Sequence, residues 1–123
     1  MIGRMARSVL VVDDDAAFRR LAARMLIAAG LVVVGEAATA ADASAAAKAL
    51  KPDAALVDVM LADGDGIALA TELTALPWRP RVLLTSSDPD AASSGEVARS
   101  RARAFVAKSE LPHAPLHRLF FDD

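Results

Sequence analysis

The sequence contains no cysteine and no tyrosine, and aromatic residues make up only 4% of its 123 residues. Without cysteine, disulfide bridges and thiolate metal sites are excluded. The shortage of aromatic rings argues against a stacking surface for single-stranded nucleic acid. Fourteen basic and sixteen acidic residues give a net charge of −2, so no basic excess favours binding to DNA or to a membrane surface.

Long apolar segments are also lacking. No stretch approaches the roughly 20 apolar residues that cross a bilayer, and residues 1–8 lack the apolar core of a signal peptide. A chain of 123 residues can form one core but not a second substantial module. We therefore expect one domain over residues 8–121, a short tail over residues 1–7, no output domain, no membrane association and a cytoplasmic location.

Strand-like and helix-like segments alternate along the chain. Apolar runs rich in β-branched residues predict strands at residues 9–12, 31–34, 54–57, 81–84 and 103–107. Helical patterns lie around residues 18–26 and at 40–50, 67–76, 91–101 and 111–121, the fourth weakened by the Ser-Ser-Gly at 93–95. This alternation with brief loops predicts an α/β fold: a doubly wound, five-stranded parallel sheet with helices on both faces.

An acidic run follows the first predicted strand, where Val9 to Val12 lead directly into Asp13, Asp14 and Asp15. At an effective dielectric of ~20, two unit charges about 5 Å apart repel by roughly 3 kcal/mol. A hard divalent cation or a large pKa shift would offset this cost. Taken alone, the run is also compatible with a solvated loop that supplies an aspartate helix cap.

The other predicted strand ends carry polar residues too. Asp58 follows the third strand, Ser86 the fourth and Lys108 the fifth. Ligands of open parallel sheets bind at the carboxyl ends of the strands, so these side chains should meet Asp13 and Asp14. The carboxylates suit Mg²⁺, whereas the hydroxyl and the ammonium suit phosphoryl oxygens. The set predicts a phosphoryl-transfer site.

Five motifs in this order resemble the receiver domain of bacterial two-component response regulators, over essentially the whole chain after residue 7. They are VVDDD at 11–15, PDAALVDVM at 52–60, DGDG at 63–66, VLLTSS at 82–87 and AFVAK at 104–108. The resemblance implies a flavodoxin-like sheet of strand order 2-1-3-4-5. It also implies a signalling module that is switched by phosphorylation, with catalysis limited to its own phosphorylation and slow hydrolysis.

Individual roles follow from the resemblance. Asp58 would accept the phosphoryl group from a histidine kinase or a phosphotransfer protein. Asp13, Asp14, Asp58 and the backbone carbonyl of Met60 would hold Mg²⁺. Ser86 and Lys108 would contact the phosphoryl oxygens, and Phe105 would be the switch aromatic. Partners, including a second copy of the chain, would bind the face formed by the last two helices and the fifth strand, with no direct nucleic-acid binding.

Two positions depart from the pattern of most receivers. Ala62 stands where proline is usual, and Ser109 replaces the proline that normally follows the lysine with a cis bond. The Lys-Ser pair is similar to receivers attached to helix-turn-helix domains of the NarL/LuxR type. The chain is therefore either a stand-alone receiver or the receiver half of a DNA-binding transcriptional regulator.

Three further hypotheses come from other classes of protein. A haloacid-dehalogenase-like phosphatase would use Asp13 and Asp15 as its Asp-x-Asp motif, but it leaves Asp58 and Lys108 unexplained. A flavodoxin-like redox module needs a hydroxyl- and glycine-rich phosphate loop after the first strand, and that loop is absent. An unphosphorylated scaffold is the remaining alternative, and the intact acidic pair, acceptor and lysine argue against it.

Overall fold

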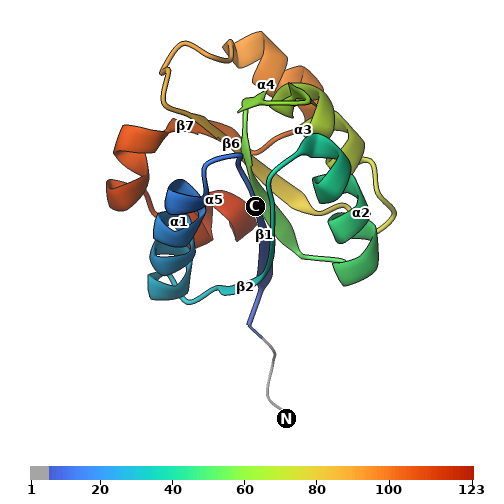
Figure 1. Ribbon diagram of the computed structural model, residues 1–123. Coiled ribbons are helices and arrows are strands. Elements are labelled where there is room, and N and C mark those ends of the chain that lie inside the picture. Colours follow the sequence, from blue (N-terminus) through green and yellow to red (C-terminus); the bar gives the residue numbers. More distant parts are fainter. Residues whose placement is uncertain (1–5) are drawn as a thin grey trace.

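A five-stranded parallel sheet forms the centre of the protein, seen in a computed structural model that describes residues 6–123 (Figure 1). The predicted N-terminal tail lies mostly outside the described residues. The strands of the sheet are β1 (Ser8–Val12), β2 (Val32–Ala37), β3 (Ala54–Asp58), β6 (Arg81–Ser86) and β7 (Ala104–Ala107). Their order is β2-β1-β3-β6-β7, which is the predicted 2-1-3-4-5 order once the five strands are counted along the chain.

Helices cover both faces of the sheet. They are α1 (Ala16–Ala28), α2 (Ala40–Leu50), α3 (Gly66–Thr74), α4 (Ser94–Ser100), the 3₁₀ helix η1 (Lys108–His113) and α5 (Leu116–Phe121). Helices α1 and α5 pack on one face, and α2, α3 and α4 pack on the other (Figure 1). No helix within residues 6–123 is long and apolar enough to span a membrane.

The central strands are buried on both faces because their side chains alternate between two cores. In β1, Leu10 and Val12 belong to the same core as residues of α2 and α3, whereas Val9 and Val11 belong to the core that includes residues of α1 and α5. Such strands are expected to be continuously apolar, as the sequence of β1 is. The burial of both faces also fixes the register of the strands, and the register determines where the polar residues at the strand ends lie along the sheet edge.

Strand β2 and the last helix differ clearly from the sequence-based prediction. Strand β2 runs to Ala37 rather than ending at residue 34, because residues 35–37 pair with the buried β1 despite a glycine and a glutamate. The last helix does not run through residues 111–121. It divides into η1 and α5 around Ala114 and Pro115, since proline has no N–H to continue a helix.

The loop after β3 contains a short hairpin. Its strands are β4 (Met60–Leu61) and β5 (Gly64–Asp65), which pair antiparallel. Asp63, at its tip, accepts hydrogen bonds from the backbone N–H groups of Ala40 and Ala41 at the start of α2. These two hydrogen bonds anchor the hairpin to the N-terminus of α2.

Helix α4 is short but has a complete cap. The hydroxyl of Ser93 accepts from the Glu96 N–H, and the Glu96 carboxylate accepts from the Ser93 N–H. The Ser-Ser-Gly segment that weakened the predicted helix over 91–101 therefore contains its start signal.

We expect Ser93→Ala to lower the free energy of unfolding by about 1 kcal/mol, because an orphan N–H loses its partner. Urea unfolding measures this change. Ser94→Ala, one residue further on, is the matched control, because no hydrogen bond of its side chain is present among the described residues. Equal effects of the two substitutions would contradict the capping role.

Candidate functional site

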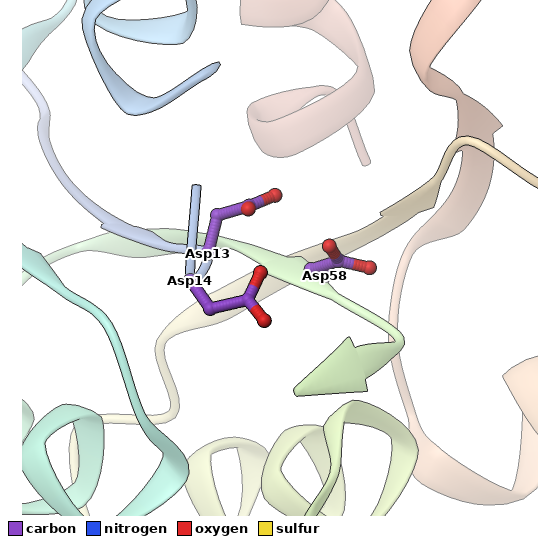
Figure 2. A group of neighbouring side chains, drawn as sticks. All are labelled: Asp13, Asp14 and Asp58. Carbon is purple, nitrogen blue, oxygen red and sulfur yellow. The ribbon is translucent and has the colours of Figure 1, made fainter. Parts of the chain in front are cut away.

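Three carboxylates converge at the carboxyl edge of the sheet. Asp13 follows β1 and is fully buried, Asp58 ends β3 and is 6% exposed, and Asp14 is exposed. One oxygen from each lies within 4.8 Å of the others (Figure 2). The structure thus brings together the acidic residues that the strand-end argument predicted.

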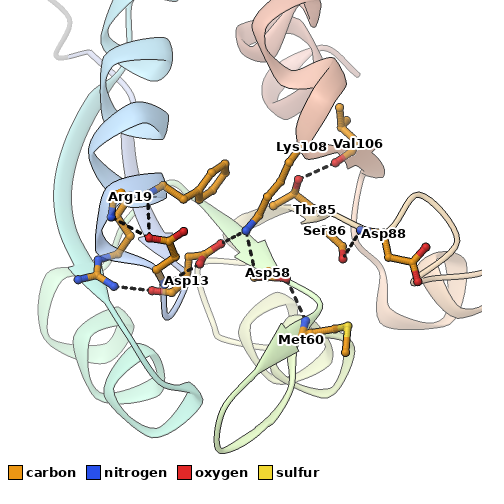
Figure 3. Close-up of polar contacts among 12 residues, drawn as sticks. Asp13, Arg19, Asp58, Met60, Thr85, Ser86, Asp88, Val106 and Lys108 are labelled. Carbon is orange, nitrogen blue, oxygen red and sulfur yellow. Dashed lines mark hydrogen bonds and ion pairs between the residues drawn. The ribbon is translucent and has the colours of Figure 1, made fainter.

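The ammonium of Lys108 lies between two of these carboxylates. Lys108 directly follows β7, and its Nζ is 2.8 Å from Asp13 Oδ2 and 3.2 Å from Asp58 Oδ2 (Figure 3). The same ammonium lies 4.1 Å from the centre of the Phe18 ring on α1, a cation–π contact that the sequence reading did not predict. One cation therefore links the ends of β1, β3 and β7.

Backbone groups hold the other oxygen of each buried carboxylate. Asp13 Oδ1 accepts from the Asp15 N–H at 2.9 Å, and Asp58 Oδ1 accepts from the Met60 N–H at 3.0 Å. Each carboxylate thus has one oxygen fixed by the following loop and one directed at Lys108. Asp15, the last residue of the acidic run, caps α1 by accepting from the Ala17 N–H.

Arg19 supports the site from α1, and the sequence reading missed it. Its Nη1 donates to the backbone carbonyl of Asp13 at 2.6 Å (Figure 3). Its Nε pairs with Glu36 of β2 at 2.8 Å. The arginine ties the end of β1 to the edge strand. The only sequence signal was a basic residue one turn into the helix, which is ordinarily a solvated position.

Burial and charge shift the pKa values of the central pair. Burial raises the pKa of the Asp13 carboxyl above its usual value, and the opposing effects of Lys108 and the Asp15 N–H do not cancel this rise. Burial alone would lower the pKa of Lys108, but the carboxylates of Asp13 and Asp58 outweigh it and raise that pKa. The Lys108 ammonium is therefore charged, whereas its contact with Asp13 does not fully offset the cost of burying that carboxylate.

The cluster fits a divalent cation. Asp13 Oδ2 faces Lys108 as an ion pair, but it is buried and accepts no hydrogen bond among the described residues. Three carboxylates and one ammonium leave two negative charges, and every converging donor atom is an oxygen. Hard divalent cations prefer oxygen ligands of this kind.

Gly66 allows the loop after β3 to fold close to Asp58. Gly66 begins α3, and its N–H donates to the Val59 carbonyl at 2.8 Å. A Cβ at this position would lie 1.9 Å from the Asp58 carbonyl oxygen. No side chain fits there without moving the backbone that carries the Asp58 carboxylate.

The two hydroxyls at the end of β6 differ in their partners. Thr85 donates to the Val106 carbonyl at 2.6 Å and so joins β6 to β7. Ser86 is buried, and its Oγ accepts from the Asp88 N–H at 3.1 Å (Figure 3). No hydrogen bond joins Ser86 to Asp58 within the described residues.

Phe105 lies apart from this cluster. It is half-buried in β7 and lines a surface groove of about 540 Å³ beside α4. The structure therefore places it on the face where the sequence reading expected partners, and not among the carboxylates.

Comparison with known proteins identifies the family. Residues 9–119 match the response regulator receiver domain. The chain belongs to this family. The chemotaxis protein CheY of Thermotoga maritima is 29% identical over 88% of this chain and 90% of its own length. The DNA-binding transcriptional activator DevR/DosR of Mycobacterium tuberculosis is 42% identical over 68% of this chain but only 40% of its own length.

A solved receiver domain agrees with the fold. The signal receiver domain of the response regulator NarL from M. tuberculosis has a TM-score of 0.76 and 30% identity, covering 94% of this chain and 98% of that domain. The protein is thus a phosphorylation-controlled receiver of two-component signalling, which implies histidine kinases or other phosphodonors as partners. The phosphatase and redox hypotheses are not favoured.

We expect Gly66→Ala to destabilise this receiver domain by about 3 kcal/mol or more, because the new Cβ overlaps the Asp58 carbonyl. Urea unfolding followed by the fluorescence of Trp78, the only tryptophan, measures the change. Gly64→Ala is the matched control, since a Cβ there meets only Ala40 at an ordinary 3.8 Å and should cost less than about 0.5 kcal/mol. A Gly66→Ala protein as stable as the Gly64→Ala protein would contradict the close approach.

Proposed function

We propose that Asp58 is the phosphoacceptor of this receiver. One carboxylate oxygen attacks the phosphorus of a phosphohistidine on the partner, so that a P–O bond forms while the P–N bond breaks. The imidazole leaves and takes up a proton. The observation that carries the assignment is the convergence on Asp58 of Asp13, Asp14 and the Lys108 ammonium.

We further propose that Asp13, Asp14, Asp58 and the backbone carbonyl of Met60 hold Mg²⁺. When bound, the ion would neutralise charge on the phosphoryl oxygens and on the three carboxylates. Two observations support this assignment: Asp13 Oδ2 is buried and accepts no hydrogen bond among the described residues, and the three carboxylates keep two negative charges beyond that of the Lys108 ammonium.

Lys108 and Ser86 are proposed to bind the transferred group. Phosphorylation adds negative charge and strong acceptor oxygens at Asp58, where Lys108 already donates at 3.2 Å. Ser86 lies on the neighbouring strand, and its hydroxyl proton is not used by the described residues. Contacts from Lys108 and Ser86 to phosphoryl oxygens can form only after phosphorylation, so they can shift the population between two arrangements of the loops.

The output surface is proposed to lie on α4, β7 and α5. The groove beside Phe105 supports this choice, because a rotation of that ring would change its shape. A second copy of the chain is one proposed partner of this surface. We also propose that the domain comprises residues 8–121 and that it does not bind nucleic acid directly. Its catalysis would be limited to its own phosphorylation and hydrolysis.

Added Mg²⁺ should stabilise the wild-type protein, because only the folded chain assembles the site. At a free concentration ten times the dissociation constant, the free energy of unfolding should rise by about 1.4 kcal/mol. Thermal unfolding with increasing Mg²⁺ measures this. Asp14→Asn should lose the effect, and Asp15→Asn should keep it, because asparagine caps a helix as well as aspartate does. A wild-type midpoint that does not respond to Mg²⁺ would overturn the metal site.

Phosphorylation is tested by intact mass after incubation with phosphoramidate, with and without Mg²⁺. We expect the wild-type chain to gain one phosphoryl group only when Mg²⁺ is present, and Asp58→Asn to gain none. Asp65→Asn is the control, because it removes a nearby carboxylate while asparagine can still cap α3. Labelling that persists in Asp58→Asn would assign the acceptor elsewhere.

A further inference from the structure

A groove lies on the surface beside the loop that follows β3, and Met60 is the one residue that it shares with the proposed metal site. It has a volume of about 520 Å³ and runs between the β4–β5 hairpin and the segment from Asp88 to Glu96. Its apolar lining includes Val59, Leu61 and Ile67. Met60 adds a methionine side chain that is 65% exposed, the most exposed of the large hydrophobic residues described.

The polar residues of the groove are all acidic. Asp65 stands on the hairpin side, and Asp88, Asp90 and Glu96 stand on the opposite side. No lysine or arginine lines the groove. Arg99 lies near enough to Glu96 to help lower its pKa, after the larger effect of the Ser93 N–H and hydroxyl, but it is not part of the lining.

These carboxylates are not arranged as an ion site. Within residues 6–123, Asp13, Asp14 and Asp58 are the one group of such residues that converges closely enough to hold a metal. The carboxylates of the groove instead surround an apolar floor. That combination matches a lysine or arginine side chain, which has an apolar stem and a charged end.

Local hydrogen bonds hold both walls in place. On one side, Asp65 caps α3 by accepting from the Ile67 N–H. On the other, the Asp88 N–H donates to Ser86 Oγ (Figure 3). The Asp88 carboxylate also accepts from the Asp90 N–H. A preformed groove lowers the ordering cost of binding. The Ser86 contact also connects one wall to the proposed phosphoryl site.

We propose that this groove binds a basic segment of a partner protein, with an apolar or aliphatic side chain on the floor and arginine or lysine ends on the acidic rim. Charge complementarity selects this occupant, since the lining is acidic and the floor is apolar. The interaction needs no phosphoryl group, so it stands or falls separately from the phosphoacceptor assignment.

The probe is the peptide acetyl-Leu-Arg-Leu-Arg-amide, titrated into the unphosphorylated protein at low salt. We expect saturable changes in the NMR amide signals of Leu61, Asp90 and Ala91, with a dissociation constant of about 1 mM that weakens as salt is added. The analogue with glutamate in place of arginine should not bind. Absence of saturation, equal binding of the glutamate peptide, or changes confined to the groove at Phe105 would each overturn the proposal.

Matched charge variants test the rim. Asp88→Asn with Asp90→Asn removes two charges but keeps an oxygen at position 88 to accept from the Asp90 N–H. This double variant should weaken peptide binding about threefold or more at low salt. Asp42→Asn with Asp122→Asn removes two exposed charges elsewhere and should leave binding unchanged. An equal loss in both double variants would show a general charge effect and overturn the assignment to the groove.

Discussion

The geometry of the site depends on one cation held between buried carboxylates. The Lys108 ammonium contacts Asp13 at 2.8 Å and Asp58 at 3.2 Å, and it reaches them from the end of a third strand. Without it, two buried carboxylates would repel across a short distance, at a cost of about 3 kcal/mol at an effective dielectric of 20. Because its position follows from that of β7, the strand order of the sheet determines the electrostatics of the site.

The loops after β1 and β3 orient the carboxylates that the strands position. Asp13 and Asp58 each accept one N–H from the residue two positions later, and this leaves the second oxygen of each to face Lys108. At Asp58 this arrangement requires the chain to turn back at once, and Gly66 is the residue that permits the close approach. Arg19 plays the corresponding part at Asp13 by holding its carbonyl. Pre-positioned oxygens of this kind cost little reorganisation when a cation or a phosphoryl group binds.

The sequence predicts the parts that follow from the alternation of strands and helices. The positions of Asp13, Asp58 and Lys108 at one edge needed only the rule that parallel strands end together. The parts it could not predict depend on side chains that meet across the fold. Asp63 binds α2 from 23 positions away, Arg19 joins two strands, and neither residue type has a distinctive local pattern. The break at Pro115 was visible in the sequence, but the apolar periodicity of residues 111–121 outweighed it in the prediction.

The hydrogen bonds of the two adjacent hydroxyls of β6 favour Ser86 over Thr85 as the group proposed to bind a phosphoryl oxygen. The Thr85 hydroxyl donates at 2.6 Å to a carbonyl of β7, so turning it toward Asp58 would break a link between strands. Ser86 only accepts, from the Asp88 N–H, and its proton remains available to an incoming oxygen. A hydrogen bond donated by the Ser86 hydroxyl would involve the same Oγ atom that accepts from the Asp88 N–H on one side of the acidic groove. A movement of the Ser86 hydroxyl toward Asp58 would therefore reach the acidic groove through the single hydrogen bond from the Asp88 N–H, and not through a chain of packed side chains.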